Sequence, residues 1–269
     1  MSQLAFELPG LPEPLFTATP SKLAALDTCP RRYRFGYLDR PTPPQSMPRV
    51  NASVGAAVHA ALRSWWELPA AGRTPVAARR LLDRHWTTVD AVDAPDSAQW
   101  HARAAGWLDE HVAGLDPDDP PLATERQVTV TTATLSVSGR VDRIDERGAE
   151  LVVVDYKTGR RPSTEAEAAD SQALALYVLG VRRTFRRPCT RVELHHLPTG
   201  SVAAFEHTPQ TLAAHVQRAE ATAAAATAAA AAVTAGADPD DAFPVVTGPH
   251  CGGCPFRRSC PEGRAALRA

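Results

Sequence analysis

The chain has 269 residues and a formal net charge of −1, from 29 Lys and Arg against 30 Asp and Glu. This balance excludes a histone-like polycation, although a local basic face could still bind nucleic acid. Hydrophobic residues make up 44% and charged residues 22%, as in a globular protein. The sequence has no apolar run of the roughly 18 residues that a membrane-spanning helix needs. The first 20 residues contain neither Lys nor Arg, so we expect no signal peptide and a cytoplasmic protein.

The first part of the chain is predicted to be helical after a proline-rich arm. Residues 1–20 contain four prolines and are expected to be extended. Ser21 is a candidate N-cap for one helix that runs through Leu23 towards Tyr37. The prolines of residues 41–48 indicate a loop. Apolar residues at helical spacing predict a helix over 54–66, and two more helices are expected over 75–93 and 97–114.

The middle of the chain changes from helical to alternating periodicity. Alternation predicts three strands with a turn at Arg147-Gly148, over 127–132, 135–144 and 151–156. A helix over 165–180 and a hairpin over 191–205 are expected to follow. Pro209 begins a long final helix, in which residues 221–232 are ten Ala and two Thr and are interpreted as a spacer. Helices, a small sheet and further helices predict an α/β fold with an antiparallel component.

Two of these strands carry acidic residues and a lysine on one predicted face. Asp155 and Lys157 point to the same side because side chains alternate along a strand. If the hairpin is symmetric about its turn, Asp142 pairs with Val153 and lies one diagonal step from Asp155. Carboxylate oxygens suit Mg²⁺ or Mn²⁺, and a nearby lysine can orient or deprotonate a water that attacks phosphorus. On an exposed strand the same residues would form a solvated ion pair, but the apolar run Leu151–Val154 favours a buried strand.

His59 lies in a predicted helix among small residues that allow close packing. It shares the inward side of that helix with Gly55 and Leu62. An inward histidine can simply be a core residue. In the company of Asp142 and Asp155 it becomes a candidate metal ligand.

Four of the five cysteines come from the two ends of the chain. Cys251, Cys254 and Cys260 follow one another closely, Cys29 lies far upstream, and Cys189 stands alone. A disulfide framework is not expected in a cytosolic protein. Four thiolates suit a [4Fe–4S] cluster or a structural zinc ion, and His250 could serve in a Cys3His zinc site. Closure through the distant N-terminal cysteine is less usual for a zinc finger, whose ligands come from one short segment. Either group would tie the first helix to the C-terminal tail.

Arginines gather beside these motifs. Each could be a solvated surface group, but together they predict a polyphosphate substrate. The groups are Arg31, Arg32 and Arg34; Arg160 and Arg161; Arg182, Arg183, Arg186 and Arg187; and Arg257 and Arg258.

The order of these motifs resembles that of PD-(D/E)XK nucleases of the RecB type. The similarity is to the iron–sulfur branch seen in AddB nuclease domains and in CRISPR-associated exonucleases, and it covers residues 21–263. It rests on five ordered motifs: Ser21-x-Leu23 with Cys29-Pro30-x2-Tyr33, Gly55-x2-Val58-His59, Gly139-Arg140-Val141-Asp142, Asp155-Tyr156-Lys157, and the spacing of Cys251, Cys254 and Cys260.

The resemblance implies a role for each matching residue of the acidic site. His59, Asp142, Asp155 and the Tyr156 carbonyl would bind Mg²⁺ or Mn²⁺, and Lys157 would position the nucleophilic water. Asp142, Asp155 and Lys157 are thereby expected to be catalytic, and Glu125 resembles an auxiliary acidic residue of the family.

The resemblance also implies a cluster and contacts with DNA. A [4Fe–4S] cluster would be held by Cys29, Cys251, Cys254 and Cys260, with zinc as the less favoured substitute. Gln172 and Tyr177 resemble a Gln…Tyr helix motif that touches DNA or orders the site, although they lie five residues apart, one more than one helix face requires. Arg32 and Arg160, from the arginine groups, are expected to contact DNA as well.

The implied fold is a restriction-endonuclease-like α/β core, with a small mixed sheet flanked by helices. Residues 1–20 would be an extended arm, and 21–263 a single nuclease domain. Its parts would be a helical region over 21–115 with the first cluster cysteine, a catalytic sheet over 122–205, and a long helix with the cysteine-rich tail over 209–263.

The sequence therefore predicts a metal-dependent DNA nuclease that acts on single strands or ends in repair or recombination, near the nucleoid. The Gly-x4-Gly-Lys-Ser/Thr phosphate loop of helicases is absent, so ATP-driven unwinding would need a separate helicase. One alternative is a nuclease of CRISPR spacer acquisition. Another is a non-catalytic iron–sulfur DNA-binding module of a helicase partner, against which the intact His59, Asp142, Asp155 and Lys157 argue.

Overall fold

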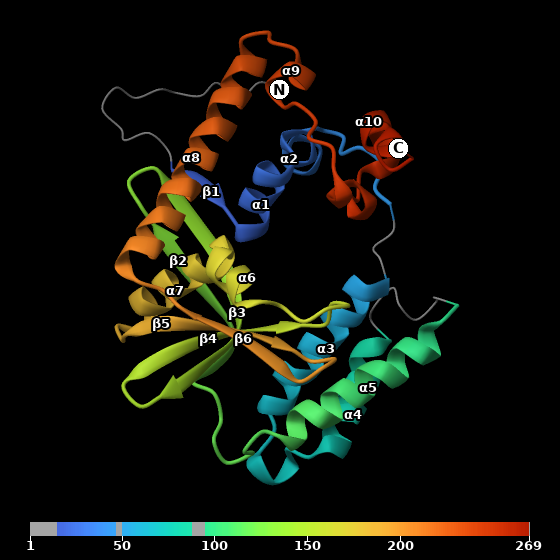
Figure 1. The fold of residues 1–269 in the computed structure, drawn as a ribbon, viewed down its shortest axis with the longest axis vertical. Helices are drawn as coiled ribbons and strands as arrows, with labels where there is room; N and C mark the ends of the chain where they lie inside the picture. Colours follow the sequence, from blue (N-terminus) through green and yellow to red (C-terminus); the bar gives the residue numbers. More distant parts are fainter. Residues whose placement is uncertain (1–14, 47–49, 88–94, 269) are drawn as a thin grey trace, which may run out of the picture.

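The computed structural model describes residues 15–46, 50–87 and 95–268, and builds them around one mixed six-stranded sheet (Figure 1). The expectations for residues 1–14, 47–48 and 88–93 lie outside the described residues. The strands are β1 (Phe16–Ala18), β2 (Ala123–Thr131), β3 (Leu135–Arg147), β4 (Glu150–Lys157), β5 (Cys189–His196) and β6 (Ser201–Glu206).

The sheet has the order β1-β3-β4-β5-β6, and β2 also pairs with β3. Antiparallel pairs join β2 to β3, β3 to β4 and β5 to β6, whereas β1 runs parallel to β3 and β4 parallel to β5. A parallel pair requires a crossover connection. Two helices, α6 (Glu165–Asp170) and α7 (Gln172–Phe185), provide it between β4 and β5. The predicted α/β fold with a mixed central sheet flanked by helices is confirmed.

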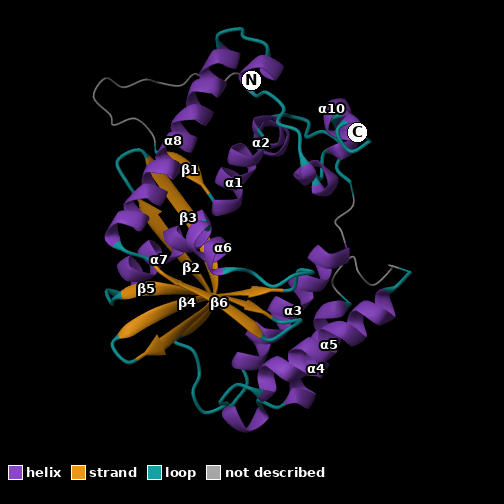
Figure 2. Ribbon diagram, viewed as in Figure 1, coloured by secondary structure: helices purple, strands orange, loops and turns teal. Residues whose placement is uncertain are grey.

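Helices cover the sheet in two separate groups (Figures 1 and 2). The first group packs on the side of Val152, Val154 and Tyr156. The second lies on the side of Leu151 and Val153 and includes α7. The first group is α3 (Val50–Trp66), α4 (Pro75–Trp86) and α5 (Ser97–Ala113), and the remaining long helices are α1 (Pro20–Thr28), α2 (Pro30–Tyr37) and α8 (Pro209–Thr234). Successive residues of β4 thus pack alternately into two different cores, which explains why the sequence of this strand is continuously apolar.

The helix expected over 21–37 is two helices, α1 and α2. Cys29 between them has extended backbone angles, φ −164° and ψ 109°. Pro30 causes the break, because a residue before proline is excluded from the helical region. The N-cap is Thr19 rather than Ser21, and its side chain accepts a hydrogen bond from the Lys22 backbone N–H. Within the expected extended arm, Phe16–Ala18 adds a parallel strand to the sheet.

Two further elements differ from the expected ones. The helix expected over 165–180 is divided at Ser171, whose extended backbone ends α6 and whose side chain caps α7. In the β3–β4 hairpin Ile144 lies opposite Val153, so the register is displaced by two residues from the expected one. The turn consists of Gly148-Ala149, with Gly148 at φ +63°, a conformation that glycine adopts without strain. Because the displacement is two residues, every side chain keeps its predicted face.

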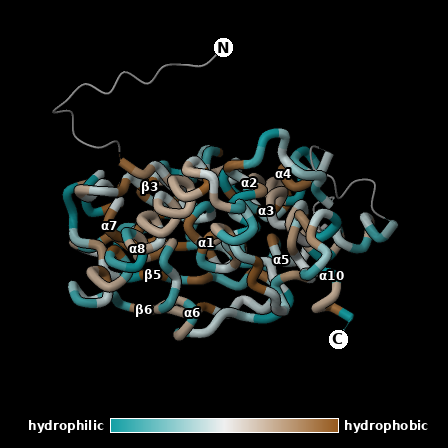
Figure 3. Tube along the Cα trace, turned by 90° about the horizontal axis from the view of Figure 1, so that it is seen from above, coloured by the Kyte–Doolittle hydropathy of each residue, from teal (hydrophilic) through white to brown (hydrophobic). Residues whose placement is uncertain are grey.

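The alanine-rich helix begins at Pro209 as expected, but it is more than a spacer. Ala219 and Ala223 are buried against Leu23 of α1, and Ala226 packs with Ala25. Small side chains allow α1 and α8 to approach each other closely. In the whole molecule the hydrophobic segments lie mainly towards the interior (Figure 3). Among the described helices none combines the length and the apolar character needed to cross a membrane.

A short C-terminal segment closes the chain beside α2. It consists of α9 (Pro239–Ala242), two 3-10 turns over Pro249–Gly253 and Arg257–Ser259, and α10 (Pro261–Ala265). Figure 1 shows this red segment lying near blue α2, so the C-terminal segment of the chain lies beside one of its N-terminal helices. The four cysteines of the predicted cluster lie in this region.

A buried histidine should make folding sensitive to acid. Burial, together with the charge of Arg143, lowers the pKa of His111 to about 3. Below its unfolded pKa near 6.5, the unfolded chain takes up a proton that the folded chain does not, so stability falls with falling pH. The His111→Phe variant should therefore lose less stability between pH 6 and pH 4, by up to about 1.4 kcal/mol per pH unit. Urea unfolding at each pH measures this, and parallel curves for the two proteins would contradict it.

Candidate active site

A cleft with a volume of about 850 Å³ opens where several elements meet at one end of the sheet. Residues from α1, α3, β2, β3 and α7 line it. The acidic residues in its wall are Glu125 and Asp142, with His59 beside them. Of the predicted site residues, the cleft thus collects His59, Glu125, Asp142 and Tyr177, which come from four different elements.

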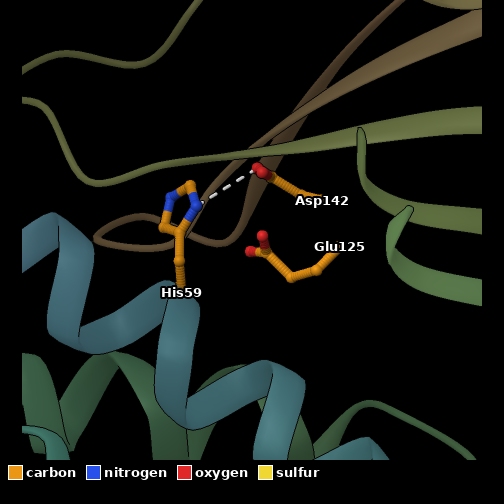
Figure 4. A group of neighbouring side chains, drawn as sticks. All are labelled: His59, Glu125 and Asp142. Carbon is orange, nitrogen blue, oxygen red and sulfur yellow. Dashed lines mark ion pairs between the residues drawn. The ribbon is translucent and has the colours of Figure 1, made fainter. Parts of the chain in front are cut away.

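His59, Glu125 and Asp142 form one group of potential metal ligands (Figure 4). One nitrogen or oxygen of each lies within 4.8 Å of the others, and the described residues contain no second such group of His, Cys, Asp and Glu. His59 Nδ1 lies 3.3 Å from Asp142 Oδ2, and His59 Nε2 lies 3.1 Å from the Tyr156 carbonyl oxygen. The backbone N–H of Tyr156 donates a hydrogen bond of 2.9 Å to Asp142 Oδ2. The end of β4 is thereby linked to both His59 and Asp142.

Close packing of α3 positions His59. A Cβ atom on Gly55, one turn before His59, would come within 2.9 Å of Thr158 Oγ1, just after β4. Only glycine leaves α3 this close to the strand end. Small residues beside His59 were the sequence signal for this approach.

Glu125 has a backbone conformation that the sequence did not reveal. It lies in the left-handed region, at φ +48°, near the start of strand β2. Its neighbours Thr124 and Arg126 still pair with Arg143 and Val141 of β3. A residue other than glycine in this region costs roughly 1–3 kcal/mol and is typical of functional sites. The auxiliary acidic residue of the sequence analysis is therefore part of the central group.

Asp155 and Lys157 lie beside this group on β4. Lys157 Nζ is 2.6 Å from Asp155 Oδ2. The β3–β4 register, continued by one residue, places Asp155 directly opposite Asp142 rather than one diagonal step away. Burial and the negative charge of Asp142 raise the pKa of Asp155, against the opposing effect of Lys157. Two carboxylates close together in a partly dry site favour a bound cation.

The protonation of His59 follows from the same charges. Burial by itself lowers the pKa of His59, but the hydrogen bond and charge of Asp142 outweigh this effect. Asp155 and Glu125 act in the same direction, so the pKa of His59 is raised overall. The carboxylates around His59 thus outweigh its burial, and the same negative charges would attract a divalent cation.

Tyr177 and Gln172 lie on different sides of α7. Tyr177 lines the cleft, where burial and the charges of Asp155 and Asp142 raise its pKa to about 12. Gln172 is buried, and its side-chain oxygen accepts hydrogen bonds from two groups of α8, the Ala219 N–H at 3.2 Å and Arg218 Nε at 3.1 Å. A separation of five residues corresponds to about 140° around a helix, so Gln172 and Tyr177 point to different surfaces of α7. The structure places Tyr177 in the cleft wall and buries Gln172 against α8, and the expected role of the two residues in touching DNA or ordering the site stays a prediction.

Gly139 gives Tyr177 its position. A Cβ atom at residue 139 would lie 2.4 Å from Tyr177 Cε1 and 3.2 Å from Pro20 Cδ. Gly139→Ala should therefore displace the ring, destabilise the protein by about 1–3 kcal/mol, and lower any activity of the cleft. Gly106→Ala is a matched control, because nothing lies within 4 Å of the added Cβ and alanine stabilises a helix by roughly 0.5–1 kcal/mol. Thermal unfolding of both variants measures the difference, and equal stabilities would contradict the expectation.

Two arginines of the cleft wall were absent from the predicted contacts. Arg63 lies four residues after His59, on the same side of α3, so helical periodicity could have predicted that it lies beside the site. Arg140 lies two residues before Asp142, and its Nε is 2.5 Å from Glu125 Oε2. Of the predicted contacts, Arg160 is exposed just after Lys157, whereas Arg32 lines the cysteine pocket instead.

The four end cysteines line one pocket together, and Cys189 is buried separately in β5. Backbone N–H groups approach two of the sulfurs: Val246 N lies 3.5 Å from Cys29 Sγ, and Gly263 N lies 3.3 Å from Cys260 Sγ. The pocket has a mainly apolar lining that includes Phe35 and Phe256. The set consists of Cys29, Cys251, Cys254 and Cys260. The predicted convergence of these cysteines from the two ends of the chain is thus present in the structure.

Buried arginines of α2 hold the cysteine-bearing segments together. Arg31 forms ion pairs with Asp240 at 3.3 Å and with Glu262 at 2.7 Å. Arg34 contacts the same Asp240 at 2.8 Å. Charge-assisted contacts of this kind fix α9 and α10 against α2, although their carboxylates are partly exposed.

Comparisons with known proteins agree with this geometry. The chain resembles a crystal structure of a "putative exonuclease" from Eubacterium rectale, with a TM-score of 0.50, 10% identity, and coverage of 84% of this chain and 86% of that one. At this identity the likeness concerns the fold alone. A comparison with curated proteins finds no match. Residues 17–261 match the PD-(D/E)XK nuclease superfamily, and the chain therefore belongs to that superfamily.

Proposed function

We propose that this protein is a Mg²⁺- or Mn²⁺-dependent DNA nuclease that hydrolyses phosphodiester bonds at DNA ends or in single strands. The observation that carries the proposal is the convergence of His59, Glu125 and Asp142 in a large cleft, together with the ion pair of Asp155 and Lys157 on the neighbouring strand β4. These residues come from α3, β2, β3 and β4, so only the folded chain brings them together.

The donor set fits a hard divalent cation. One imidazole nitrogen and several carboxylate oxygens are ligands that Mg²⁺ and Mn²⁺ accept, whereas a soft metal would select thiolates. His59, Glu125 and Asp142 would hold the ion, with Asp155 and the Tyr156 carbonyl beside them. When bound, the ion supplies charge stabilisation at the phosphate and lowers the pKa of a water.

Residues of the chain would position the attacking water and bind the DNA backbone. Lys157, ion-paired with Asp155, would hold the attacking water in line with the phosphorus while the bond to the leaving sugar oxygen breaks. Arg63 and Arg140 of the cleft wall and the exposed Arg160 would contact backbone phosphates. Tyr177 would order the wall beside Gly139.

For the cysteine pocket we propose a [4Fe–4S] cluster. A tetrahedral zinc site would bring its thiolate sulfurs to about 3.8 Å from one another, because each Zn–S bond is about 2.3 Å. Within the described structure, however, no three cysteine sulfurs lie within 4.8 Å of one another. In a [4Fe–4S] cluster each thiolate binds a different iron, so its sulfurs stand farther apart than around a single zinc ion. The cluster would tie α2 to the C-terminal segment and form one side of a DNA-binding clamp together with Arg32.

We further propose that the protein acts in DNA repair or recombination in the cytoplasm, with a separate helicase supplying single strands.

Cleavage of end-labelled single- and double-stranded DNA tests the proposal, with protein purified anaerobically and assayed with Mg²⁺, Mn²⁺ or EDTA. The wild type should cut only with the metal, and Asp155→Ala should lose at least about 100-fold in rate while still binding DNA. A brown protein with about four iron atoms per chain is expected. A folded protein that binds DNA but cuts nothing would support the non-catalytic module instead, and stoichiometric zinc without colour would overturn the cluster.

A further inference from the structure

The side of the sheet away from Asp142 and Asp155 carries a buried arginine that the proposed mechanism does not use. Arg143 follows Asp142 on β3 and is only 4% exposed. Its Nη1 lies 3.1 Å from the Tyr156 hydroxyl and its Nη2 lies 2.9 Å from Asp145 Oδ2. In a second contact with the same carboxylate, its Nε lies 2.8 Å from Asp145 Oδ1. The planar guanidinium thus joins a buried tyrosine to a carboxylate.

This contact lies where the two central strands separate. The paired residues of β3 and β4 end at Arg143 and Val154, so backbone hydrogen bonds no longer hold Tyr156 to β3. Instead, two side chains of β3 form hydrogen bonds with Tyr156. On one side of the sheet Asp142 accepts from the Tyr156 N–H, and on the other Arg143 donates to the Tyr156 hydroxyl.

Tyr156 in turn contacts the proposed metal site through its backbone. Its N–H binds Asp142, and its carbonyl oxygen lies 3.1 Å from His59 Nε2. The ring is 4% exposed and packs edge-on against the imidazoles of His59 and His111, with centroids 5.8 Å and 5.4 Å away. A shift of this ring would therefore move both backbone groups relative to His59 and Asp142.

Stability alone does not explain a charge at position 143. Burying a guanidinium and a carboxylate costs desolvation energy, and apolar side chains of similar volume are often equally stabilising in such places. The fork of an arginine, in contrast, fixes the direction of each of its acceptors. We propose that Arg143 is a positioning residue that sets the spacing of Asp142, His59 and the Tyr156 carbonyl, and thus the affinity of the site for a divalent cation.

This inference rests on the proposed function, and Mn²⁺ binding in the absence of DNA tests it. Free Mn²⁺ is measured by electron paramagnetic resonance in a titration of the whole protein. Tyr156→Phe removes only the hydroxyl and Arg143→Met removes the fork at similar volume. Each should weaken Mn²⁺ binding by about tenfold, as the loss of an outer partner of a metal ligand typically does. KM for DNA should stay within twofold of the wild type while kcat at limiting Mn²⁺ falls.

Arg34→Met is the matched control. Arg34 of α2 is also buried, and its guanidinium also pairs with a carboxylate, that of Asp240, at 2.8 Å. It does not line the cleft, so its loss should lower the melting temperature without changing Mn²⁺ affinity. If Tyr156→Phe binds Mn²⁺ as the wild type does, or if Arg34→Met weakens binding equally, the positioning role is wrong. A wild type that binds no Mn²⁺ would overturn the proposed function together with this role.

Discussion

Replacing Asp142 by asparagine should abolish cleavage almost completely, with a fall in kcat of about 1,000-fold or more. Asp142 is the residue that links the parts of the site. One of its oxygens accepts from the Tyr156 N–H, lies 3.3 Å from His59, and belongs to the group with Glu125. Asparagine keeps the shape but removes the charge, so the cation would lose its central ligand. Initial rates on end-labelled DNA at saturating Mg²⁺ measure the effect.

The fold and the affinity for DNA should survive this change. DNA affinity, measured by fluorescence anisotropy in EDTA, should change by less than about threefold, because one carboxylate fewer slightly reduces repulsion of the phosphates. Asp119→Asn, an exposed carboxylate outside this cleft, is the charge-matched control and should cut at the wild-type rate. Full activity of Asp142→Asn would show that the site has been placed wrongly.

Replacing Cys254 by serine should have the largest effect on stability. The side chain lines the pocket with the other three end cysteines, and a serine hydroxyl is a poor ligand for iron or zinc at neutral pH. Loss of the bound group would free α10 and its neighbours from α2, because metal binding at such sites contributes directly to folding. We expect loss of most of the iron and colour, and a melting temperature lower by about 5 °C or more.

Cys189→Ala separates this effect from the loss of any buried thiol. Cys189 is fully buried in β5, remote in sequence from the pocket, so its truncation should lower stability by leaving a small cavity. Its iron content should equal that of the wild type. If Cys254→Ser keeps its iron, or if Cys189→Ala loses it, the ligand set proposed from the pocket would be incorrect.

The face on which the acidic residues lie was predictable, although their partners were not. Alternation along β4 puts Asp155 and Lys157 on one side whatever the register. The length of the turn decided that Ile144 meets Val153, and thereby that Asp142 stands opposite Asp155. Periodicity is a local property of the chain, whereas register depends on a glycine with positive φ and on the cores on both sides of the sheet.

The position of Glu125 could not be predicted from local periodicity at all. Its left-handed conformation within β2 has no local signal, because alternation would predict an ordinary strand residue there. Such strain persists only when surrounding packing maintains it. The same holds for Gln172, whose polar side chain is buried against α8 rather than turned to the cleft.

Periodicity and residue type predicted most of the helices and strands in their order, the side of β4 that carries charge, and the two sets of candidate ligands. These follow from periodicity, proline and residue type, which act over a few residues. The tertiary structure decided which of those residues meet: Glu125 with His59 and Asp142, Arg143 with Tyr156, and Arg31 with Asp240 and Glu262. Contacts between distant segments depend on how helices and strands pack, and this packing is a property of the whole chain.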